Sequence, residues 1–158
     1  MPQQEGFPKR TLEDDGFTPN PPSAYVEFGL ATCFSFLHAA SDAIDLASTG
    51  NTLGYDSIGV ADRNTLSGVV RMHTAADKAC VRPLIGCRMV LLCGTEILAY
   101  PQDRDAYARL STLLSKGKMQ DMDGGWQEKG ETHLTLEMLA THADGLHLIV
   151  IPQDNLDV

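Results

Sequence analysis

Several motifs that commonly carry function are missing from this 158-residue sequence. Its four cysteines, Cys33, Cys80, Cys87 and Cys93, form no CxxC pair, which argues against a zinc ribbon. Neither a GxGxxG nor a GxxxxGK[ST] loop is present to cradle a nucleotide phosphate. The five histidines include no HxH and no HExxH pair, so they offer no recognisable start to a metal site.

Positive charge and long apolar runs are also scarce. The net charge is −9 and the 12 Lys and Arg residues are scattered, which argues against independent binding to duplex DNA. No apolar run approaches the roughly 18 residues of a membrane span, and the first six residues lack the apolar core of a signal peptide. We therefore expect a cytoplasmic protein without membrane contact, whose cysteines are buried, reduced thiols.

What the sequence does contain is an alternation of strand-like and helix-like segments. This alternation predicts an α/β fold with parallel strands and crossover helices, interrupted by one hairpin. The expected strands are 25–30, 57–61, 84–92, 96–100 and 146–151, and the expected helices are 41–54, 66–79, 103–116 and 135–141.

Composition divides the chain into three parts. Residues 1–23 are rich in Pro, Gly, Asp and Glu, which predicts a flexible leader. Residues 24–152 hold the periodic segments and form the predicted domain, and residues 153–158 are a polar tail. With 43% hydrophobic and 21% charged residues overall, the composition is that of a globular protein.

The most informative stretch begins at Asp62-Arg63-Asn64, directly after an apolar strand-like run. An acidic residue at the carboxyl end of a buried strand is where α/β folds place their chemistry. The next residue, however, is a fixed cation, and a guanidinium has no lone pair with which to ligate a metal. The position is typical of a catalytic site, whereas the composition predicts a site without its metal.

Three groups of residues together resemble a known family. They are Thr32-Cys33-Phe34-Ser35-Phe36-Leu37-His38, then Ile58-Gly59-Val60-Ala61-Asp62-Arg63-Asn64, and finally Pro83-Leu84-Ile85-Gly86 with Tyr100-Pro101-Gln102-Asp103-Arg104. In combination they resemble the N-terminal PHP (polymerase and histidinol phosphatase) region of bacterial C-family DNA polymerases. The likeness is strongest to the error-prone branch, which is related to the polymerase III alpha subunit.

The resemblance implies that residues 24–152 form the opening portion of a distorted (β/α)7 barrel. In metal-binding members, ligands stand at the positions of Gly29, Ala31, Asp62, Arg63 and Arg88. Only Asp62 offers lone pairs here, so the resemblance implies a degenerate site with no bound metal and no catalytic residue. We further hypothesise that Arg63 and Arg88 pair with Asp62 in place of a metal.

By resemblance, the function is that of the N-terminal segment of an error-prone DNA-directed DNA polymerase in DNA damage tolerance. The segment is expected to be a structural platform without polymerase or proofreading activity, because the family's palm carboxylates lie beyond it. Its expected partners are the remainder of the polymerase in cis, DNA through the full enzyme only, and damage-response accessory proteins. No cofactor is expected on this segment, since magnesium belongs to the full polymerase.

Two alternatives remain open on the sequence alone. The chain could be a free-standing metal-dependent phosphoesterase that assembles Asp62 with histidines such as His38 and His73. It could also be a non-catalytic interaction module. An assay for metal-dependent hydrolysis of a generic phosphodiester would distinguish the first alternative from the polymerase segment. A pull-down of partner proteins, with and without the rest of the polymerase, would test the second.

Overall fold

The structure is a computed structural model that describes Pro21 and residues 24–119, 123 and 125–152. The predicted leader, apart from Pro21, and the predicted tail therefore lie outside the described residues. The elements follow the order β1 Glu27–Leu30, α1 Ala43–Thr52, β2 Ser57–Arg63, α2 Val69–Lys78, β3 Arg82–Val90, β4 Glu96–Pro101, α3 Arg104–Met119, α4 Leu136–His142 and β5 Leu146–Ile151.

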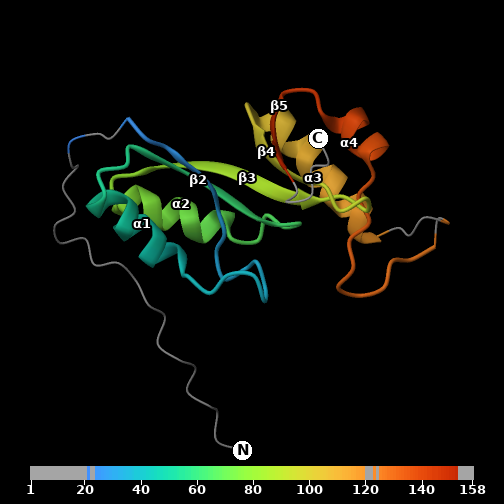
Figure 1. The fold of residues 1–158 in the computed structure, drawn as a ribbon, viewed down its shortest axis with the longest axis horizontal. Helices are drawn as coiled ribbons and strands as arrows, with labels where there is room; N and C mark the ends of the chain where they lie inside the picture. Colours follow the sequence, from blue (N-terminus) through green and yellow to red (C-terminus); the bar gives the residue numbers. More distant parts are fainter. Residues whose placement is uncertain (1–20, 22–23, 120–122, 124, 153–158) are drawn as a thin grey trace, which may run out of the picture.

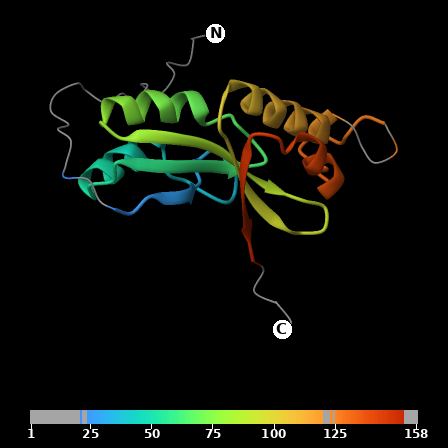
Figure 2. The same ribbon diagram turned by 90° about the horizontal axis from the view of Figure 1, so that it is seen from above.

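The described strands form one curled sheet, a half-barrel with the sequential order β1-β2-β3-β4-β5 (Figures 1 and 2). Strands β1, β2 and β3 are parallel, as the alternating pattern predicted. Strand β4 returns antiparallel to β3 through the predicted hairpin, and β5 is antiparallel to β4. Consequently β5 runs in the same direction as β1 to β3, and the mixed α/β fold is confirmed.

Two apolar clusters join the sheet to its helices, which lie along one face (Figure 2). The first packs Ile58 and Val60 of β2 against α1 and α2. The second packs Cys87 and Met89 of β3 against α3 and α4. These side chains alternate along their strands, so the residues between them project from the other face of the sheet.

The opposite face of the sheet, which we call the open face, carries Ala61, Leu98 and Tyr100. The ring of Tyr100 lies directly over Gly86, where an added Cβ would come within 2.6 Å of the ring carbons. Glycine at this position therefore provides the space that the aromatic ring occupies.

The sequence predicts where the helices begin and end better than it predicts which of their residues are buried. Asp103 caps α3 by accepting a hydrogen bond from the Ala106 backbone nitrogen, and Thr135 caps α4 in the same way. In α2, the spacing of Val69, Val70, His73, Ala76 and Ala79 in the sequence predicts one shared side, yet Val70 is 76% exposed and His73 is exposed as well. The helix begins only at Val69, so Val70 lies in its first turn, and the residues buried within the helix are Met72, Ala75 and Ala76.

The prediction of buried thiols is wrong for three of the four cysteines. Cys33, Cys80 and Cys93 are exposed, and only Cys87 is buried. The exposed three lie in connecting segments rather than in strands, since Cys33 follows β1, Cys80 follows α2 and Cys93 lies in the β3–β4 turn. Neighbouring apolar residues do not bury a side chain where the backbone turns at the surface.

Candidate functional site

Asp62, near the end of β2, is buried and holds a loop in place. Its Oδ1 atom accepts hydrogen bonds from the Thr32 backbone nitrogen and from Ser35 Oγ, each at 2.7 Å, and its Oδ2 atom accepts from Thr32 Oγ1 at 2.8 Å. Asp62 is only 2% exposed. The carboxylate therefore fixes the segment after β1 to the end of β2 through neutral donors.

Gly68 closes this carboxylate from the side of α2. A Cβ added at Gly68 would collide with Asp62 Oδ2 and would lie 2.8 Å from Thr32 Oγ1. The backbone of the α2 N-cap thus lies against the carboxylate and its hydroxyl partner. Together with the three hydrogen bonds, this packing encloses the carboxylate, which is why Asp62 is so little exposed.

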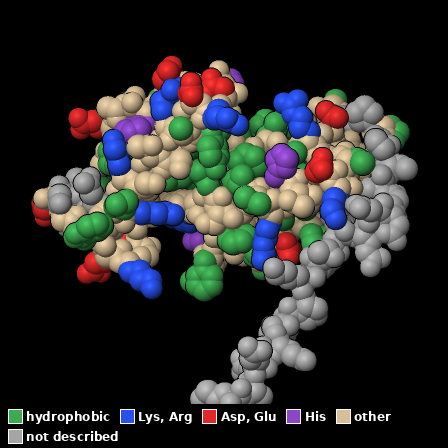
Figure 3. Space-filling view, turned by 180° about the vertical axis from the view of Figure 1, so that it is seen from behind, with side chains coloured by type: hydrophobic (Ala, Val, Ile, Leu, Met, Phe, Trp, Pro, Cys, Tyr) green, Lys and Arg blue, Asp and Glu red, His purple; other side chains and the backbone are tan. Residues whose placement is uncertain are grey.

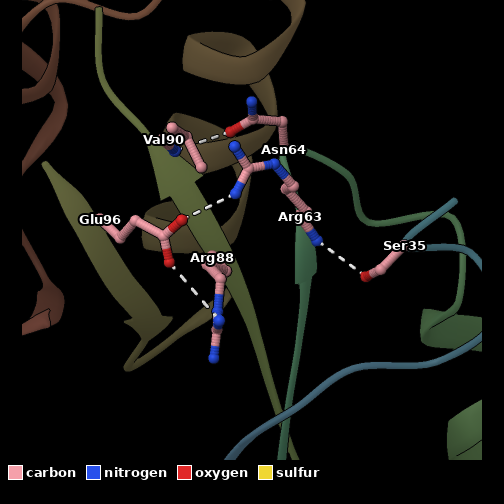
Figure 4. Close-up of polar contacts among 6 residues, drawn as sticks. All are labelled: Ser35, Arg63, Asn64, Arg88, Val90 and Glu96. Atoms are coloured by element: carbon pink, nitrogen blue, oxygen red, sulfur yellow. Dashed lines mark hydrogen bonds and ion pairs between the residues drawn. The ribbon is translucent and has the colours of Figure 1, made fainter. Parts of the chain in front are cut away.

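Arg63 and Arg88 lie on the open face, where they share a different carboxylate (Figure 4). Arg63 Nη1 donates to Glu96 Oε1 at 2.7 Å, and Arg88 Nη1 lies 3.5 Å from Glu96 Oε2. Each of the three side chains is about a third exposed: 31% for Arg63, 33% for Arg88 and 28% for Glu96. We call Arg63, Arg88 and Glu96 the arginine–glutamate cluster.

The hypothesis that these arginines pair with Asp62 is wrong. Successive residues of a strand point to opposite faces of a sheet, so Asp62 faces the helices and Arg63 faces away from them. Glu96, at the start of β4, provides the carboxylate instead. Glu96 lies opposite Val90, two residues along β3 from Arg88, and this register depends on the hairpin.

Of the five positions that the resemblance singled out, the structure brings three together. Gly29 has φ +90°, and a Cβ there would lie 3.4 Å from Arg88 Nη2, so Gly29 borders the cluster that contains Arg63 and Arg88. Asp62 lies on the other face, and Ala31 follows the end of β1. The residues that sequence reasoning missed are Glu96 and the Asp62 donors Thr32 and Ser35.

Asn64 and Ser35 lock the end of β2 beside the cluster. Asn64, with φ +50°, donates its backbone nitrogen to the Arg88 carbonyl and accepts from the Val90 nitrogen through Oδ1. Ser35 Oγ accepts from the Arg63 nitrogen at 3.0 Å (Figure 4). The backbone that carries both arginines is therefore held on two sides by side-chain hydrogen bonds.

Two other groups near the site are held neutral. Burial raises the pKa of the Tyr100 hydroxyl to about 12, and that hydroxyl oxygen accepts a hydrogen bond from the Gly29 nitrogen at 3.1 Å. Burial likewise raises the pKa of the Cys87 thiol to about 12. At neutral pH neither group supplies an anionic ligand or an activated nucleophile.

The residues of the site do not fit the divalent metal that the resemblance associates with this position. The cluster holds two guanidinium groups, which cannot coordinate and which repel a cation. Asp62 faces away, and both of its carboxylate oxygens already accept hydrogen bonds. Across the described residues, no three His, Cys, Asp or Glu side chains gather into a possible metal site. That no metal binds stays a prediction, because metal binding has to be measured.

A cavity of about 600 Å³ adjoins Arg63 at the same end of the sheet. Its lining combines Phe34 and Phe36 with Arg63, Lys118 and Lys129, but also with Glu128 and Glu131. On the face seen in Figure 3, acidic and basic side chains are likewise interspersed. Neither surface has the excess of positive charge that grips a nucleic-acid backbone.

Comparison with known proteins places the fold and the site in a family. The PHP domain matches residues 29–154, which include all of the sheet except the first two residues of β1, its helices and both carboxylates described above. The chain belongs to the PHP domain family. The fold is similar to that of a solved protein of Bifidobacterium adolescentis described as a putative metal-dependent phosphoesterase, with a TM-score of 0.50 and 16% identity. That alignment covers 77% of this chain and 52% of the other, and it speaks for the fold alone.

The chain is also similar, at greater sequence identity, to several error-prone DNA polymerases. An error-prone DNA polymerase of Caulobacter vibrioides is 42% identical over 137 residues, which are 86% of this chain and 12% of the polymerase. Error-prone DNA polymerases of Allorhizobium ampelinum and Bradyrhizobium diazoefficiens are 44% and 45% identical over 81% and 80% of this chain, and 11% of each polymerase. The chain thus spans about an eighth of the length of these relatives. In the part of the chain that the structure describes, no helix has the length and hydropathy needed to cross a membrane.

Proposed function

We propose that this PHP domain is the N-terminal platform of an error-prone DNA polymerase that acts in DNA damage tolerance. The observation that carries the proposal is the identity of 42% to the Caulobacter vibrioides error-prone DNA polymerase over nearly the whole chain. The likeness extends well beyond the short motifs, because it covers 137 residues. The catalytic machinery for polymerisation belongs to the other seven-eighths of such a protein.

The sheet supports a role as a platform for further polypeptide. In the described part of the chain, β5 pairs with β4 along one edge, and no strand pairs with its other edge. Leu148, Ile149 and Val150 of β5 are 39%, 40% and 61% exposed. An apolar edge strand is ordinarily covered by further chain. The polymerase remainder in cis is the proposed cover, and damage-response accessory proteins and DNA would be met only through the complete enzyme.

The second element of the proposal is that this domain does not proofread. Metal-dependent hydrolysis needs lone-pair ligands, and the arginine–glutamate cluster replaces them with cations. The phosphoesterase alternative requires Asp62, His38 and His73 to act together. Asp62 is buried under Gly68, whereas both histidines are exposed, so this alternative has the weaker support.

A chimera tests the proposal directly. The matching N-terminal region of the Caulobacter vibrioides polymerase would be replaced by this chain, and primer extension compared with that of the parent and of a deletion lacking the region. The chimera should extend primers and the deletion should not, and the chain alone should neither extend nor trim a primer. A folded chimera without extension, or manganese-dependent removal of 3′ nucleotides by the chain alone, would contradict it.

A further inference from the structure

The two outer strands of the described sheet, β1 and β5, differ in how well their edges are protected (Figure 1). Strand β1 has four residues and an irregular register against β2, and it contains Glu27 and a glycine, Gly29, with φ +90°. Short length, charge and an irregular backbone are features that keep an edge strand from pairing. Strand β5 has six residues and contains no Asp, Glu, Lys, Arg, Gly or Pro. It is therefore the edge that remains able to pair.

The hydrogen bonds of β5 show which of its backbone groups point outward. Directly beyond the end of the β4–β5 register, the Gln102 nitrogen donates to the carbonyl of Gly145, the residue opposite it. Hydrogen-bonded pairs of an antiparallel ladder recur at every second residue, so the odd-numbered residues of β5 bond to β4. The backbone groups of Leu148 and Val150 consequently point away from β4, towards a side on which no described strand lies.

The side chains of β5 make this edge apolar on both faces of the sheet. Ile149 is opposite Leu98 of β4, which places Ile149 on the open face together with His147. Leu148 and Val150 point to the other face and are exposed. His147 and Ile149 also line a groove of about 950 Å³. A strand added beside β5 would place every second side chain next to this groove.

A second copy of β5 complements the edge. An antiparallel pair of identical strands has a two-fold axis, so each contact occurs twice. With this axis at Ile149, Leu148 pairs with Val150 of the second copy, and the pairing uses the N–H and C=O groups of both residues. His147 is then opposite Ile151 of the second copy. Because β5 carries no fixed charge, no like charges oppose each other in this register.

We propose that two copies of the 158-residue chain pair through β5, antiparallel about a two-fold axis at Ile149, and join their sheets into one. The open faces of the two copies lie on the same side of the joined sheet, because Ile149 is opposite Ile149 of the second copy. Association ends at the dimer, since the remaining outer strands are the two protected β1 edges. The inference does not rest on the polymerase function. An attached polymerase remainder would cover the same edge and exclude the second copy.

The experiment combines sedimentation equilibrium with amide hydrogen exchange, both on the complete chain over a range of protein concentrations. The mass should rise from that of one 17.1 kDa chain to twice this value and then stop rising. Over the same range, exchange of the Leu148 and Val150 amides should slow at least about tenfold. The Ile149 and Ile151 amides, which bond to β4, should exchange at a rate independent of concentration. This alternation distinguishes pairing of strand edges from contact through side chains alone.

Val150→Pro removes an outward N–H and should weaken dimerisation at least about tenfold. The matched control is Val150→Thr, which keeps both the N–H and the β-branched shape and should dimerise about as strongly as the wild type. Should Val150→Pro fail to fold, Leu148→Lys places a charge on the edge and should also weaken the dimer.

The proposal is overturned if the wild-type chain stays monomeric up to about 1 mM. It is equally overturned if the chain associates without slower exchange at Leu148 and Val150, or if a folded Val150→Pro or Leu148→Lys protein dimerises like the wild type. A chimera that fails to extend primers, together with a chain that dimerises as described, would remove the proposed function and leave this inference standing.

Discussion

Asp62 and Arg63 are neighbours in sequence, yet their side chains lie on opposite faces of the sheet and bind different partners. Asp62 holds Thr32 and Ser35 on the helix side, while Arg63 binds Glu96 on the open face. The positions that the resemblance associates with metal ligands are thus divided between two separate structures. One is a buried, neutral-donor anchor, and the other is a partly exposed arginine–glutamate cluster.

The anchor makes a prediction about stability. Asp62→Asn removes the charge and turns one oxygen into a donor that faces the Thr32 hydroxyl, so we expect the free energy of unfolding to fall by about 2 kcal/mol. Urea denaturation followed by circular dichroism would measure the change. The control is Asp77→Asn, an exposed position in α2, which should alter stability by less than about 0.5 kcal/mol. Equal effects of the two substitutions would argue against the anchor.

Gly68 should be intolerant of even a methyl group. Gly68→Ala places a carbon against Asp62 Oδ2 and Thr32 Oγ1, so the α2 N-cap must move away, at a cost of about 1–3 kcal/mol. Thermal unfolding would record the loss. Ser67→Ala, at the exposed neighbouring position, should leave the midpoint almost unchanged. A Gly68→Ala protein as stable as the wild type would show that the packing against the carboxylate is looser than described.

Tyr100 predicts a loss of stability at high pH. Its pKa is about 12 in the folded chain against 10.0 ordinarily, so the unfolded chain releases the proton first. Stability from this group is therefore complete below pH 10 and declines as the pH rises from about 10 towards 12. Tyr100→Phe should remove this part of the decline. It should also cost about 1 kcal/mol at neutral pH, because the Gly29 nitrogen loses its acceptor.

The measurement is urea denaturation of both proteins at pH 8, 10 and 11. The free energies of unfolding of the two proteins should converge as the pH rises, because only the wild type has a hydroxyl at position 100 that ionises on unfolding. Curves that stay parallel over this range would mean that burial does not hold the hydroxyl neutral.

The edge of β5 predicts self-association of the isolated chain. Val150 is 61% exposed on a strand whose other edge is unpaired within the described residues, and such an edge recruits other strands. Val150→Lys should reduce association, as measured by light scattering over a range of protein concentrations. Val70→Lys, at a position 76% exposed on helix α2, should have little effect because a helix offers no strand edge.

Much of the fold could be predicted because its signals are local. The caps Asp103 and Thr135 and the hairpin between β3 and β4 are each encoded within a few residues, and the structure has all of them. The exposed Val70 could not be predicted from periodicity, because the start of the helix decides which turn covers the sheet. The exposed cysteines illustrate the same limit, since burial depends on tertiary packing.

The site was less accessible to sequence reasoning. The resemblance singled out Gly29, Arg63 and Arg88, and these do come together. The pairing of Asp62 with Arg63 could have been rejected from strand alternation alone. Glu96 could not have been assigned with certainty, because its place depends on the hairpin register. The sequence did offer one indication of its role: Glu96 is the single acidic residue at the start of an otherwise apolar strand, while Arg63 and Arg88 each needed a carboxylate partner.

We propose that the two guanidinium groups and the enclosed Asp62 carboxylate leave this site without a divalent ion, and titration of the purified chain with Mn²⁺ tests this most directly. Calorimetry, supported by water-proton relaxation, should detect no saturable site, in wild type and in Asp62→Asn alike. Stoichiometric binding of one ion per chain that disappears in Asp62→Asn would contradict the account.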